Sequence, residues 1–596
     1  MSAGIAAAIL GVERSVTGRR WTGRGGAGAE TDRLGLAIAQ RHGLPEIVGR
    51  LIALRGIDLD AVERFLEPTL KAELPDPSIL KDMDAAAARL ADAVVAGATI
   101  GLFADYDVDG ATSAAQLVRY LRLVGCPSIL HIPDRIDEGY GPNLPAFLSL
   151  AARGAGPIVC LDCGILALDT LGEARRAGMD VLVVDHHLAG PELPAAVAVV
   201  NPNRLDESGA YGHLAACGVT FLVVVALNRE LRRRGWFRTR PEPDIRNLLD
   251  LVALGTVCDV VPLTGLNRAF VAQGIRVMGV RGNPGLAALG DVARLDRRPD
   301  PYHLGFVLGP RINAGGRVGR ADLGARLLST DDPVEAASLA AELDRHNEER
   351  RAIEAQVLEA AIAQAELQGD AAALVVTGEG WHPGVVGIVA SRLKDRFHRP
   401  VCVVGIEDGV GKGSGRSMPG VQLGAAVIAA QQAGVLVKGG GHAMAAGFTV
   451  AAGMVEAFRA FLCERVALDL AGTAVGASLS VDAALAPAGA TGALVRTVAR
   501  IAPFGTGNSE PRFVFPAVRV AGAAVVGEAH VRCTLAGADG GRLKAIAFRA
   551  LDNGLGAALL RAGSTPMHVA GHLRADDFRG GDQVQLIVDD AAVAAG

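Results

Sequence analysis

The sequence predicts an α/β protein with a parallel-sheet domain, a long linking helix, a smaller α/β domain and a C-terminal β-barrel. Three observations predict this fold. Five apolar runs between residues 98 and 200 alternate with helical patterns, which is typical of a parallel sheet covered by helices. Helix-start signals at Asp332 and Pro333 open a helical stretch that reaches about residue 368. Five Gly-punctuated apolar runs then lie near the C-terminus.

The chain of 596 residues is too long for one hydrophobic core. Half of its residues are hydrophobic and 21% are charged, which excludes an intrinsically disordered chain. The formal net charge of −5 does not indicate a nucleic-acid binder, so such a role must depend on local basic residues.

The N-terminal segment AGIAAAIL lacks the basic residues of a signal peptide, and no uninterrupted apolar run is long enough to span a membrane. We therefore expect a soluble, cytoplasmic protein. The eight cysteines are scattered, and Cys160 and Cys163 have CxxC spacing without a second pair to complete a zinc site. Reduced thiols are the expectation.

Residues 1–30 are rich in Gly and Arg, and we expect a flexible tail there. Helical patterns at 46–54 and 59–66 predict a helical lead-in, which we assign to the first domain over residues 31–330. An amphipathic pattern at 84–95 precedes the sheet, whose strands we expect at 98–103, 128–132, 157–161, 180–184 and 196–200, with a helix at 111–123.

Ligands of parallel sheets bind beyond the carboxyl ends of the strands. Acidic and histidine residues follow the predicted strands at that end: Asp105, Asp107, Asp109, Asp162, Asp185, His186 and His187. Asp105, Asp107 and Asp109 alternate, so on an extended chain their carboxylates would share one side. Asp259 follows a predicted helix at 245–254.

Carboxylate and imidazole ligands suit Mn²⁺ or Mg²⁺, and the histidines favour Mn²⁺. Five or more carboxylates are too many for one ion, so we expect two ions bridged by one carboxylate. Such a pair activates water and stabilises charge on a phosphoryl group. An isolated Asp is more often a helix cap, but four motifs at successive strand ends favour a metal site.

The rest of the chain is predicted in less detail. We expect a helix at 219–231, a loop-rich section that reaches GPRINAGGRVGRAD at 309–322, and the linking helix at 331–369. The smaller α/β domain (370–468) has strands at 374–377 and 401–404, a helical segment at 384–393, and Gly-rich turns at 411–417 and 438–447. Strands at 513–520, 530–535, 543–548, 567–573 and 584–588 predict a barrel of OB type over residues 475–596.

The motifs DYDVDG, LDCG, VDHH and TVCDVVPL, in this order, resemble the four signature motifs of the DHH phosphoesterase superfamily. The segments RINAGGR, GWHPGVVGIVASRL, GSGRS and GGGHAMAAGF are similar to those of its RecJ family of single-stranded-DNA-specific exonucleases. The resemblance spans residues 45–590. It implies a 5′→3′ exonuclease that requires Mn²⁺ or Mg²⁺, releases 5′-mononucleotides, and arranges DHH, DHHA1 and OB domains around a narrow groove.

The resemblance also implies roles for individual residues. Asp107, Asp109, Asp162, His186 and Asp259 match metal ligands, and with His187 they match the catalytic set. Asp105 and Asp185 match acidic residues that ligate metal or orient their neighbours. Many superfamily members have a histidine where this chain has Phe103; members of the RecJ type lack it, and Asp105 is the candidate replacement.

Further residues match groups that contact substrate. His187 is expected to contact a substrate phosphate, and Arg135, Arg311, Asn313 and Arg317 to hold the DNA backbone, since arginine forks bind phosphate and keep their charge. Ser414 and Arg416 resemble a pocket for the 5′-terminal phosphate, and His442 would face the substrate. The OB domain would grip the strand by stacking and charge, with Phe504, Phe513, Phe515, Phe548 and Phe578 as its aromatic residues.

Two other functions stay open: a DHH phosphoesterase for short oligonucleotides, cyclic dinucleotides or pyrophosphate, and a non-catalytic DNA-binding scaffold. The C-terminal domain argues against the first, and the complete set of carboxylates argues against the second. The family is associated with helicases and single-strand-binding protein in recombination and mismatch repair. We expect a monomer that binds single-stranded DNA.

Overall fold

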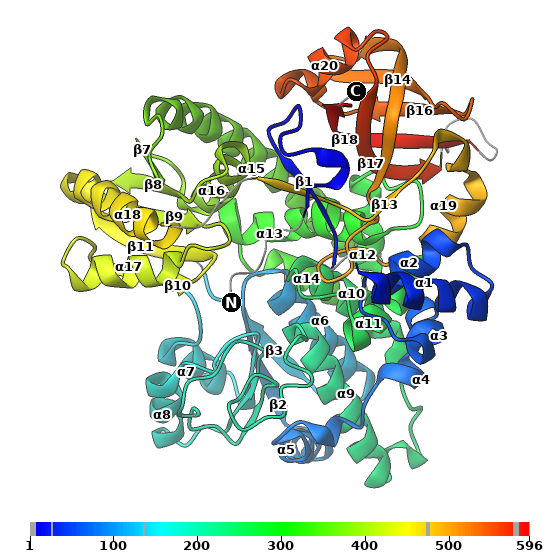
Figure 1. The fold of residues 1–596 in the computed structure, drawn as a ribbon. Helices are drawn as coiled ribbons and strands as arrows, with labels where there is room; N and C mark the ends of the chain where they lie inside the picture. Colours follow the sequence, from blue (N-terminus) through cyan, green and yellow to red (C-terminus); the bar gives the residue numbers. More distant parts are fainter. Residues whose placement is uncertain (1–6, 26–27, 135–137, 472–476, 576–582, 595–596) are drawn as a thin grey trace. The chain divides into compact units, whose positions relative to one another are not determined.

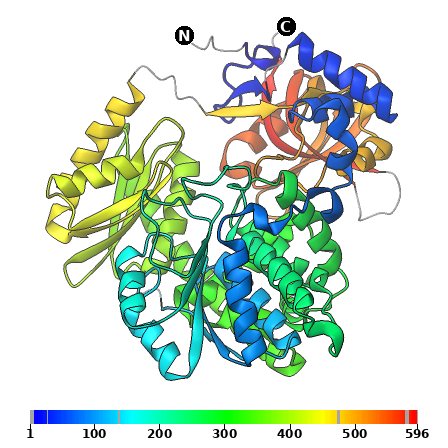
Figure 2. The same ribbon diagram turned by 90° about the horizontal axis from the view of Figure 1, so that it is seen from below.

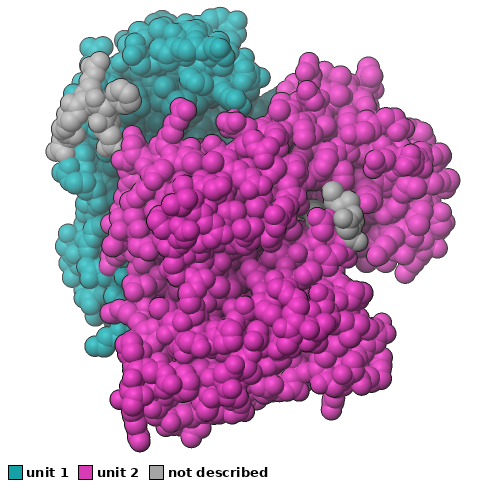
Figure 3. Space-filling model, turned by 180° about the vertical axis from the view of Figure 1, so that it is seen from behind, with its two compact units in different colours: residues 1–74, 260–273, 476–596 teal, residues 75–259, 274–475 magenta. Residues whose placement is uncertain are grey.

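The computed structural model describes residues 7–25, 28–134, 138–471, 477–575 and 583–594. The chain forms two compact units, which Figure 3 distinguishes by colour. The first comprises residues 1–74, 260–273 and 476–596, and the second comprises residues 75–259 and 274–475. No helix among the described residues is long and apolar enough to cross a membrane.

A five-stranded parallel sheet lies in the second unit (Figure 1). Its order is β3 (Ser128–His131), β2 (Thr99–Ala104), β4 (Ala155–Leu161), β5 (Val181–Val184) and β6 (Ala198–Val200), which confirms the five predicted strands. Ala104, Leu161, Val184 and Val200 are register partners in turn, so four strands end at one edge. Residues that follow these strands are therefore brought together.

Helices cover both faces of this sheet, as Figures 1 and 2 show. One face packs against α7 (Leu144–Ala152) and α8 (Leu168–Arg176) through a core that contains Phe103, Phe147 and Leu171. The other face is covered by α5 (Met83–Ala96), α6 (Val108–Leu123) and α9 (Ala216–Arg233), and α10 (Leu249–Cys258) packs on α6 and α9. This two-sided burial explains why the strands read as continuous apolar runs.

The section expected to be loop-rich is helical instead, so that prediction is wrong. It contains α11 (Gly265–Met278), α12 (Pro284–Val292), the π-helical segment η6 (His303–Leu308), α13 (Gly309–Val318) and α14 (Leu323–Ser329). Two glycines of this section allow close packing of its helices. A Cβ at Gly309 would lie 2.5 Å from Sγ of Cys258, and one at Gly324 would lie 2.6 Å from the Ile312 side chain.

The linking helix α15 (Pro333–Leu367) begins as predicted, with the Asp332 carboxylate accepting the Val334 N–H. It leads to a second sheet of order β10-β11-β9-β8-β7. The elements of this lobe are β7 (Leu374–Glu379), α16 (Pro383–Phe397), β8 (Val401–Glu407), β9 (Val410–Arg416), α17 (Leu423–Gln432), β10 (Lys438–His442), β11 (Ala445–Ala451) and α18 (Val455–Leu470).

The two Gly-rich segments of this lobe were expected to be turns, and this is wrong for most of their residues, which form β9, β10 and β11. The glycines again make room for neighbours. A Cβ at Gly413 would lie 2.3 Å from the ring of Phe448 on the paired strand, and one at Gly439 would lie 2.6 Å from Val427. Only the residues between β10 and β11 make the expected turn.

The first unit contains a closed five-stranded barrel, which confirms the predicted OB-type fold. Its strands are β14 (Phe513–Val526), β15 (His530–Ala536), β16 (Arg542–Ala547), β17 (Met567–Ala575) and β18 (Val584–Val593), and pairing of β14 with β17 closes it. Shorter elements are α1 (Ala29–His42), α2 (Glu46–Ala53), α3 (Val62–Leu66), α4 (Leu70–Glu73), β12 (Ser478–Val481), β13 (Ala483–Ala484), α19 (Gly492–Ala499) and α20 (Leu555–Arg561).

The N-terminal residues belong to this barrel unit, which corrects two expectations. Val48 and Ile52 of α2 share one hydrophobic core with Phe513 and Phe515, so the helical lead-in is not part of the parallel-sheet domain. The expected flexible tail is wrong for β1 (Arg20–Gly23), which pairs with β12. Trp21 of β1 is fully buried, and its indole N–H donates to Asp590 at 3.0 Å.

The aromatic residues expected to stack DNA bases in the barrel lie in several environments. Phe513 and Phe515 are buried in its core and cannot present a ring face to a base. Phe504 is partly buried against the same core, whereas Phe548 is 55% exposed. Phe578 lies outside the described residues. Stacking by Phe513 and Phe515 is therefore excluded.

Candidate metal centre and substrate pocket

The aligned strand ends place acidic and histidine side chains at one edge of the parallel sheet. Asp105 directly follows β2, Asp162 follows β4, and the Asp185-His186-His187 run follows β5. Asp259 caps the C-terminal end of α10. Asp162 has a φ of 60°, a left-handed conformation that Asp adopts more readily than most residues.

Asp105, Asp107 and Asp109 do not lie on an extended chain, so the expectation that they share one side of a strand end is wrong. Asp107 is the N-cap of α6, where its carboxylate accepts the Gly110 N–H at 3.0 Å, and Asp109 lies in the first helical turn. A Cβ at Gly110 would lie 2.3 Å from the carbonyl oxygen of Asp105, so this tight turn requires glycine. The turn sends Asp109 in a different direction from Asp105 and Asp107.

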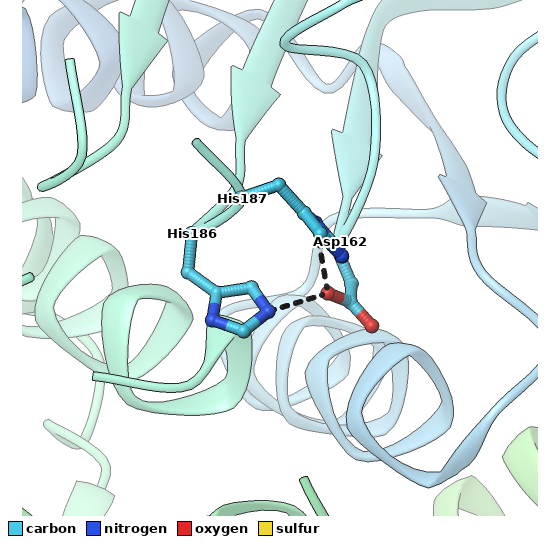
Figure 4. Close-up of side chains that lie close together, drawn as sticks. All are labelled: Asp162, His186 and His187. Atoms are coloured by element: carbon cyan, nitrogen blue, oxygen red, sulfur yellow. Dashed lines mark ion pairs between the residues drawn. The ribbon is translucent and has the colours of Figure 1, made fainter. Parts of the chain in front are cut away.

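Two sets of oxygen and nitrogen donors result, each with its ligand atoms within 4.8 Å of one another. One set is Asp105, Asp107 and Asp162, and the other is Asp109, His186 and Asp259. Asp162 also forms a set with His186 and His187, and Figure 4 shows its carboxylate directed towards both imidazoles. Asp162 and His186 thus connect the two sets.

Several contacts define the geometry around His186. Its Nε2 lies 3.4 Å from Oδ1 of Asp162 and 3.9 Å from Oδ2 of Asp109. Its Nδ1 lies 3.6 Å from Oδ2 of Asp259 and 3.1 Å from the carbonyl oxygen of Leu214. The imidazole is therefore surrounded by carboxylates from β4, α6 and α10.

The carboxylates of this centre need a positive partner. Burial raises the pKa of Asp109, and burial with the neighbouring Asp109, Asp107 and Asp105 carboxylates raises that of Asp162. Burial and the neighbouring Asp109 and Asp107 carboxylates raise the pKa of Asp259 to about 8. Within the described part of the chain, Oδ1 of Asp162 and Oδ2 of Asp259 are buried and accept no hydrogen bond. Hard oxygen donors with imidazole fit Mn²⁺ or Mg²⁺.

Asp109 is held in place by the start of α9. Its two carboxylate oxygens accept the backbone N–H groups of Ala216 and Cys217 at 2.7 and 2.8 Å. A helix N-terminus favours a carboxylate because its N–H groups and dipole present positive charge. Asp109 is thus pre-oriented towards His186 and Asp259.

Asp185, which the sequence placed among the possible ligands, lies in none of the three donor sets found among the described residues. Its oxygens accept the N–H groups of Ile165, His186 and His187 and contact Nδ1 of His187 at 2.8 Å. Burial alone would raise the pKa of Asp185, but these hydrogen bonds lower it. Burial alone would lower the pKa of His187, but the hydrogen bond to Asp185 and its negative charge outweigh burial and raise this pKa to about 9. In this structure Asp185 therefore contacts the backbone of both histidines and the ring of His187.

Sequence reasoning missed three residues of this site. Side-chain amides of Asn201 and Asn203, which follow β6, donate to the carbonyl oxygens of His187 and His186 at 2.9 and 2.5 Å. The ring of Tyr140 lies 6.2 Å from that of His187 and is 60% exposed. Position at a strand end could have identified the asparagines, and an aromatic residue in a Gly-rich loop could have identified Tyr140.

The substrate residues differ in their placement. Arg135 lies outside the described residues. Arg311 on α13 forms an ion pair with Asp344 at 2.8 Å, and Arg317 donates to the carbonyl oxygen of Gly384 at 2.8 Å. Asn313 is half-buried on α13. His442 lines a cavity of about 700 Å³ together with Tyr140, His186 and His187.

Ser414 and Arg416 lie side by side on β9, where the guanidinium contacts the hydroxyl at 3.0 Å. A Cβ at Gly387 of α16 would lie 3.0 Å from the Ser414 hydroxyl and 3.2 Å from Nη2 of Arg416. The two side chains therefore lie close to the first turns of α16. A hydroxyl and a guanidinium beside a helix N-terminal region suit an anion such as phosphate.

Family models match three segments of the chain. They are the DHH family N-terminal domain over residues 99–256, the DHHA1 domain over 369–468 and the RecJ OB domain over 481–590. The single-stranded-DNA-specific exonuclease RecJ of Escherichia coli (strain K12) is 37% identical over 568 residues, which covers 92% of this chain and 96% of that protein. That of Bacillus subtilis (strain 168) is 34% identical over 95% of this chain and 70% of that protein.

A solved structure gives the same result. RecJ from Thermus thermophilus in complex with Mn²⁺ matches with a TM-score of 0.79 and 30% identity, over 97% of this chain and 80% of that chain. The three family models, the relatives and the solved structure all indicate the same family. The chain belongs to the RecJ family of DHH phosphoesterases.

Proposed function

We propose that this chain is a single-stranded-DNA-specific exonuclease that uses two divalent ions, Mn²⁺ or Mg²⁺, to release 5′-mononucleotides from the 5′ end. The proposal depends on the two donor sets at one edge of the sheet, which are connected by Asp162 and His186. When bound, two such ions activate water and neutralise the charge that develops on a phosphoryl group. The names of the relatives support the substrate class.

His187 acts on the scissile phosphate in this proposal. Asp185 raises the pKa of His187 above its ordinary value, against the effect of burial, and so favours the charged imidazolium. Since Nδ1 is engaged by Asp185, Nε2–H is the donor left for a non-bridging phosphoryl oxygen. Asp185, Asn201 and Asn203 hold the histidines in position, and this lowers the reorganisation that the reaction requires.

The 5′ end of the strand is placed by the second lobe. Ser414 and Arg416 bind the terminal phosphate. His442 lines the same cavity as His186 and His187 and contacts the nucleotide there. Arg317 and Asn313 contact the backbone, and Arg311 contributes through its ion pair with Asp344, which anchors α13. The strand then lies between the lobes, in a groove too narrow for a duplex.

We place the protein in the cytoplasm as a monomer that acts in DNA repair and recombination on strands made accessible by a helicase and covered by single-strand-binding protein. The barrel holds the incoming strand through charge contacts with the DNA backbone and the exposed ring of Phe548.

The test is degradation of long single strands with Mn²⁺ present, with label at either end. A 5′ label should appear at once as a mononucleotide, a 3′ label should remain on long products, and a duplex should resist. Asp162→Asn should abolish release, whereas Asp169→Asn, an exposed carboxylate on α8, should not. Rapid cleavage of dinucleotides with long strands left intact would favour the small-substrate phosphoesterase instead.

A further inference from the structure

An exposed pair of aromatic side chains lies at the start of the helix that contains η6. Tyr302 is 61% exposed and Phe306 is 72% exposed. Their ring centroids are 5.2 Å apart and their planes are inclined by 27°, so the rings are stacked on each other. Aromatic residues make up only 4% of the sequence. An exposed pair of stacked rings in such a chain is a candidate binding surface.

The opposite side of this helix packs against the elements that carry the metal ligands. Cys258, the residue before Asp259, contacts the carbonyl oxygen of Leu304 through Sγ at 3.4 Å. A Cβ at Gly305 would lie 3.4 Å from Val257, and one at Gly316 would lie 3.2 Å from the carbonyl oxygen of Tyr106, between Asp105 and Asp107. The aromatic pair therefore lies on the outer side of a helix that borders the metal centre.

The pair is also held on a rigid element. Nδ1 of His303, which is buried, contacts Asp300 at 2.7 Å, and the same carboxylate accepts the His303 N–H at 3.1 Å. The His303 ring meets the Tyr302 ring edge to face at 5.8 Å. π-Helical segments are rare and are found frequently at functional sites. Rings fixed in this way lose little conformational entropy when they bind a planar ligand.

Arginines are also present in this part of the chain. Arg297 and Arg298 precede Tyr302 in the chain, and with Arg276 and Arg281 they line a cavity of about 500 Å³ to which Leu308 of η6 contributes. One carboxylate, Asp296, lines the same cavity, and Asp291 pairs with Arg281 at 2.7 Å. Stacked aromatic rings beside arginines are the combination that binds single-stranded nucleic acid through its bases and its phosphates.

We propose that Tyr302 and Phe306 form a base-stacking platform for single-stranded DNA on the outer side of the helix that borders the metal centre, and that the arginines preceding this helix contribute positive charge for the DNA backbone. This inference rests on the proposed function and deepens it. Paired bases in a duplex already stack on their neighbours and offer no free face, whereas an unpaired base does. The platform thus helps to select single strands over duplex.

The experiment compares wild type with the double variant Tyr302→Ala/Phe306→Ala on 5′-phosphorylated single strands. Loss of a stacking contact should raise KM by about 10-fold to 100-fold while kcat changes little. Tyr302→Phe/Phe306→Tyr, which keeps both rings, should retain the wild-type KM. Leu367→Ala, an exposed apolar residue at the end of α15, is the matched control and should also retain it.

Strands with single abasic sites separate base stacking from other roles. One abasic position should raise the KM of wild type by a similar factor and have no further effect on the double variant. The inference would be overturned if the abasic site raised the KM of both proteins equally, or if the double variant kept the wild-type KM. An unchanged KM is also the result expected if the pair docks another protein. Fluorescence anisotropy of a labelled strand without Mn²⁺ measures binding alone, and equal affinity of wild type and the double variant would contradict the platform. Degradation of the strand by wild type with Mn²⁺ would still support the exonuclease proposal in that case.

Discussion

The substitution Asp162→Asn should reverse its effect on stability when Mn²⁺ is added. Asp162 is 2% exposed, and its oxygen lies within 4.8 Å of those of Asp105 and Asp107. Two like charges 4.8 Å apart repel by about 3 kcal/mol at an effective dielectric constant of about 20. Asparagine removes one of these charges with the same shape, and it tolerates the φ of 60° at this position, which alanine does not.

Without metal, we therefore expect the variant to be more stable than wild type by about 1 to 3 kcal/mol, because partial protonation already relieves some of the repulsion. The sign depends on pH. The pKa of Asp162 is raised on folding, so the carboxyl is uncharged in both states below about pH 4 and the advantage of asparagine vanishes there. The advantage grows as the pH rises above the pKa of the unfolded state and is complete above the pKa of the folded state.

The assay is thermal unfolding with a chelator and with Mn²⁺. At a Mn²⁺ concentration about 1,000-fold above Kd, wild type should gain about 4.1 kcal/mol for each ion that it binds, and the variant should not gain the contribution of the ion that it has lost. The order of the two proteins should therefore reverse between the two conditions. A variant that unfolds below wild type in both conditions, by the same amount, would refute the carboxylate repulsion and the assignment of Asp162 to the metal centre.

Three further outcomes are expected. The pKa of about 8 for Asp259 predicts that Mn²⁺ affinity, measured by calorimetry, increases from about pH 6 to about pH 8, since binding displaces protons; a flat profile would contradict this. Arg416→Ala should slow degradation of 5′-phosphorylated strands about 10-fold or more but spare 5′-hydroxyl strands, with Arg465→Ala on α18 as the control; equal losses would exclude the phosphate pocket. Deletion of residues 476–596 should give an insoluble protein, because α2 would lose its core partners, and a soluble, folded product would contradict the barrel unit.

The parallel sheet and its functional edge could be predicted because the relevant information is local. Each buried strand reads as an apolar run, and the first polar residue after it lies at the ligand-binding edge, as Asp105, Asp162 and Asp185 do. The individual roles depend on contacts that no local pattern contains. Asp185 accepts three backbone N–H groups and lies in none of the donor sets found among the described residues, and Asp109 is held by the start of a helix more than 100 residues later.

The wrong predictions have a common cause in the glycines and in long-range pairing. Gly413 and Gly439 were interpreted as turn residues, but each lies where a neighbouring side chain leaves no room for a Cβ. β1 forms only because β12, far along the chain, supplies its partner and Asp590 accepts the indole N–H of Trp21. A single sequence does not reveal which distant segment fills such a position.

Anomalous scattering from a crystal soaked in Mn²⁺ tests the metal centre most directly. Two peaks are expected, one among the oxygens of Asp105, Asp107 and Asp162 and one among Asp109, His186 and Asp259. Soaked crystals of Asp162→Asn should lose the first peak and keep the second. A single peak in wild type, or density outside both donor sets, would contradict the two-ion centre from which the proposed exonuclease activity is derived.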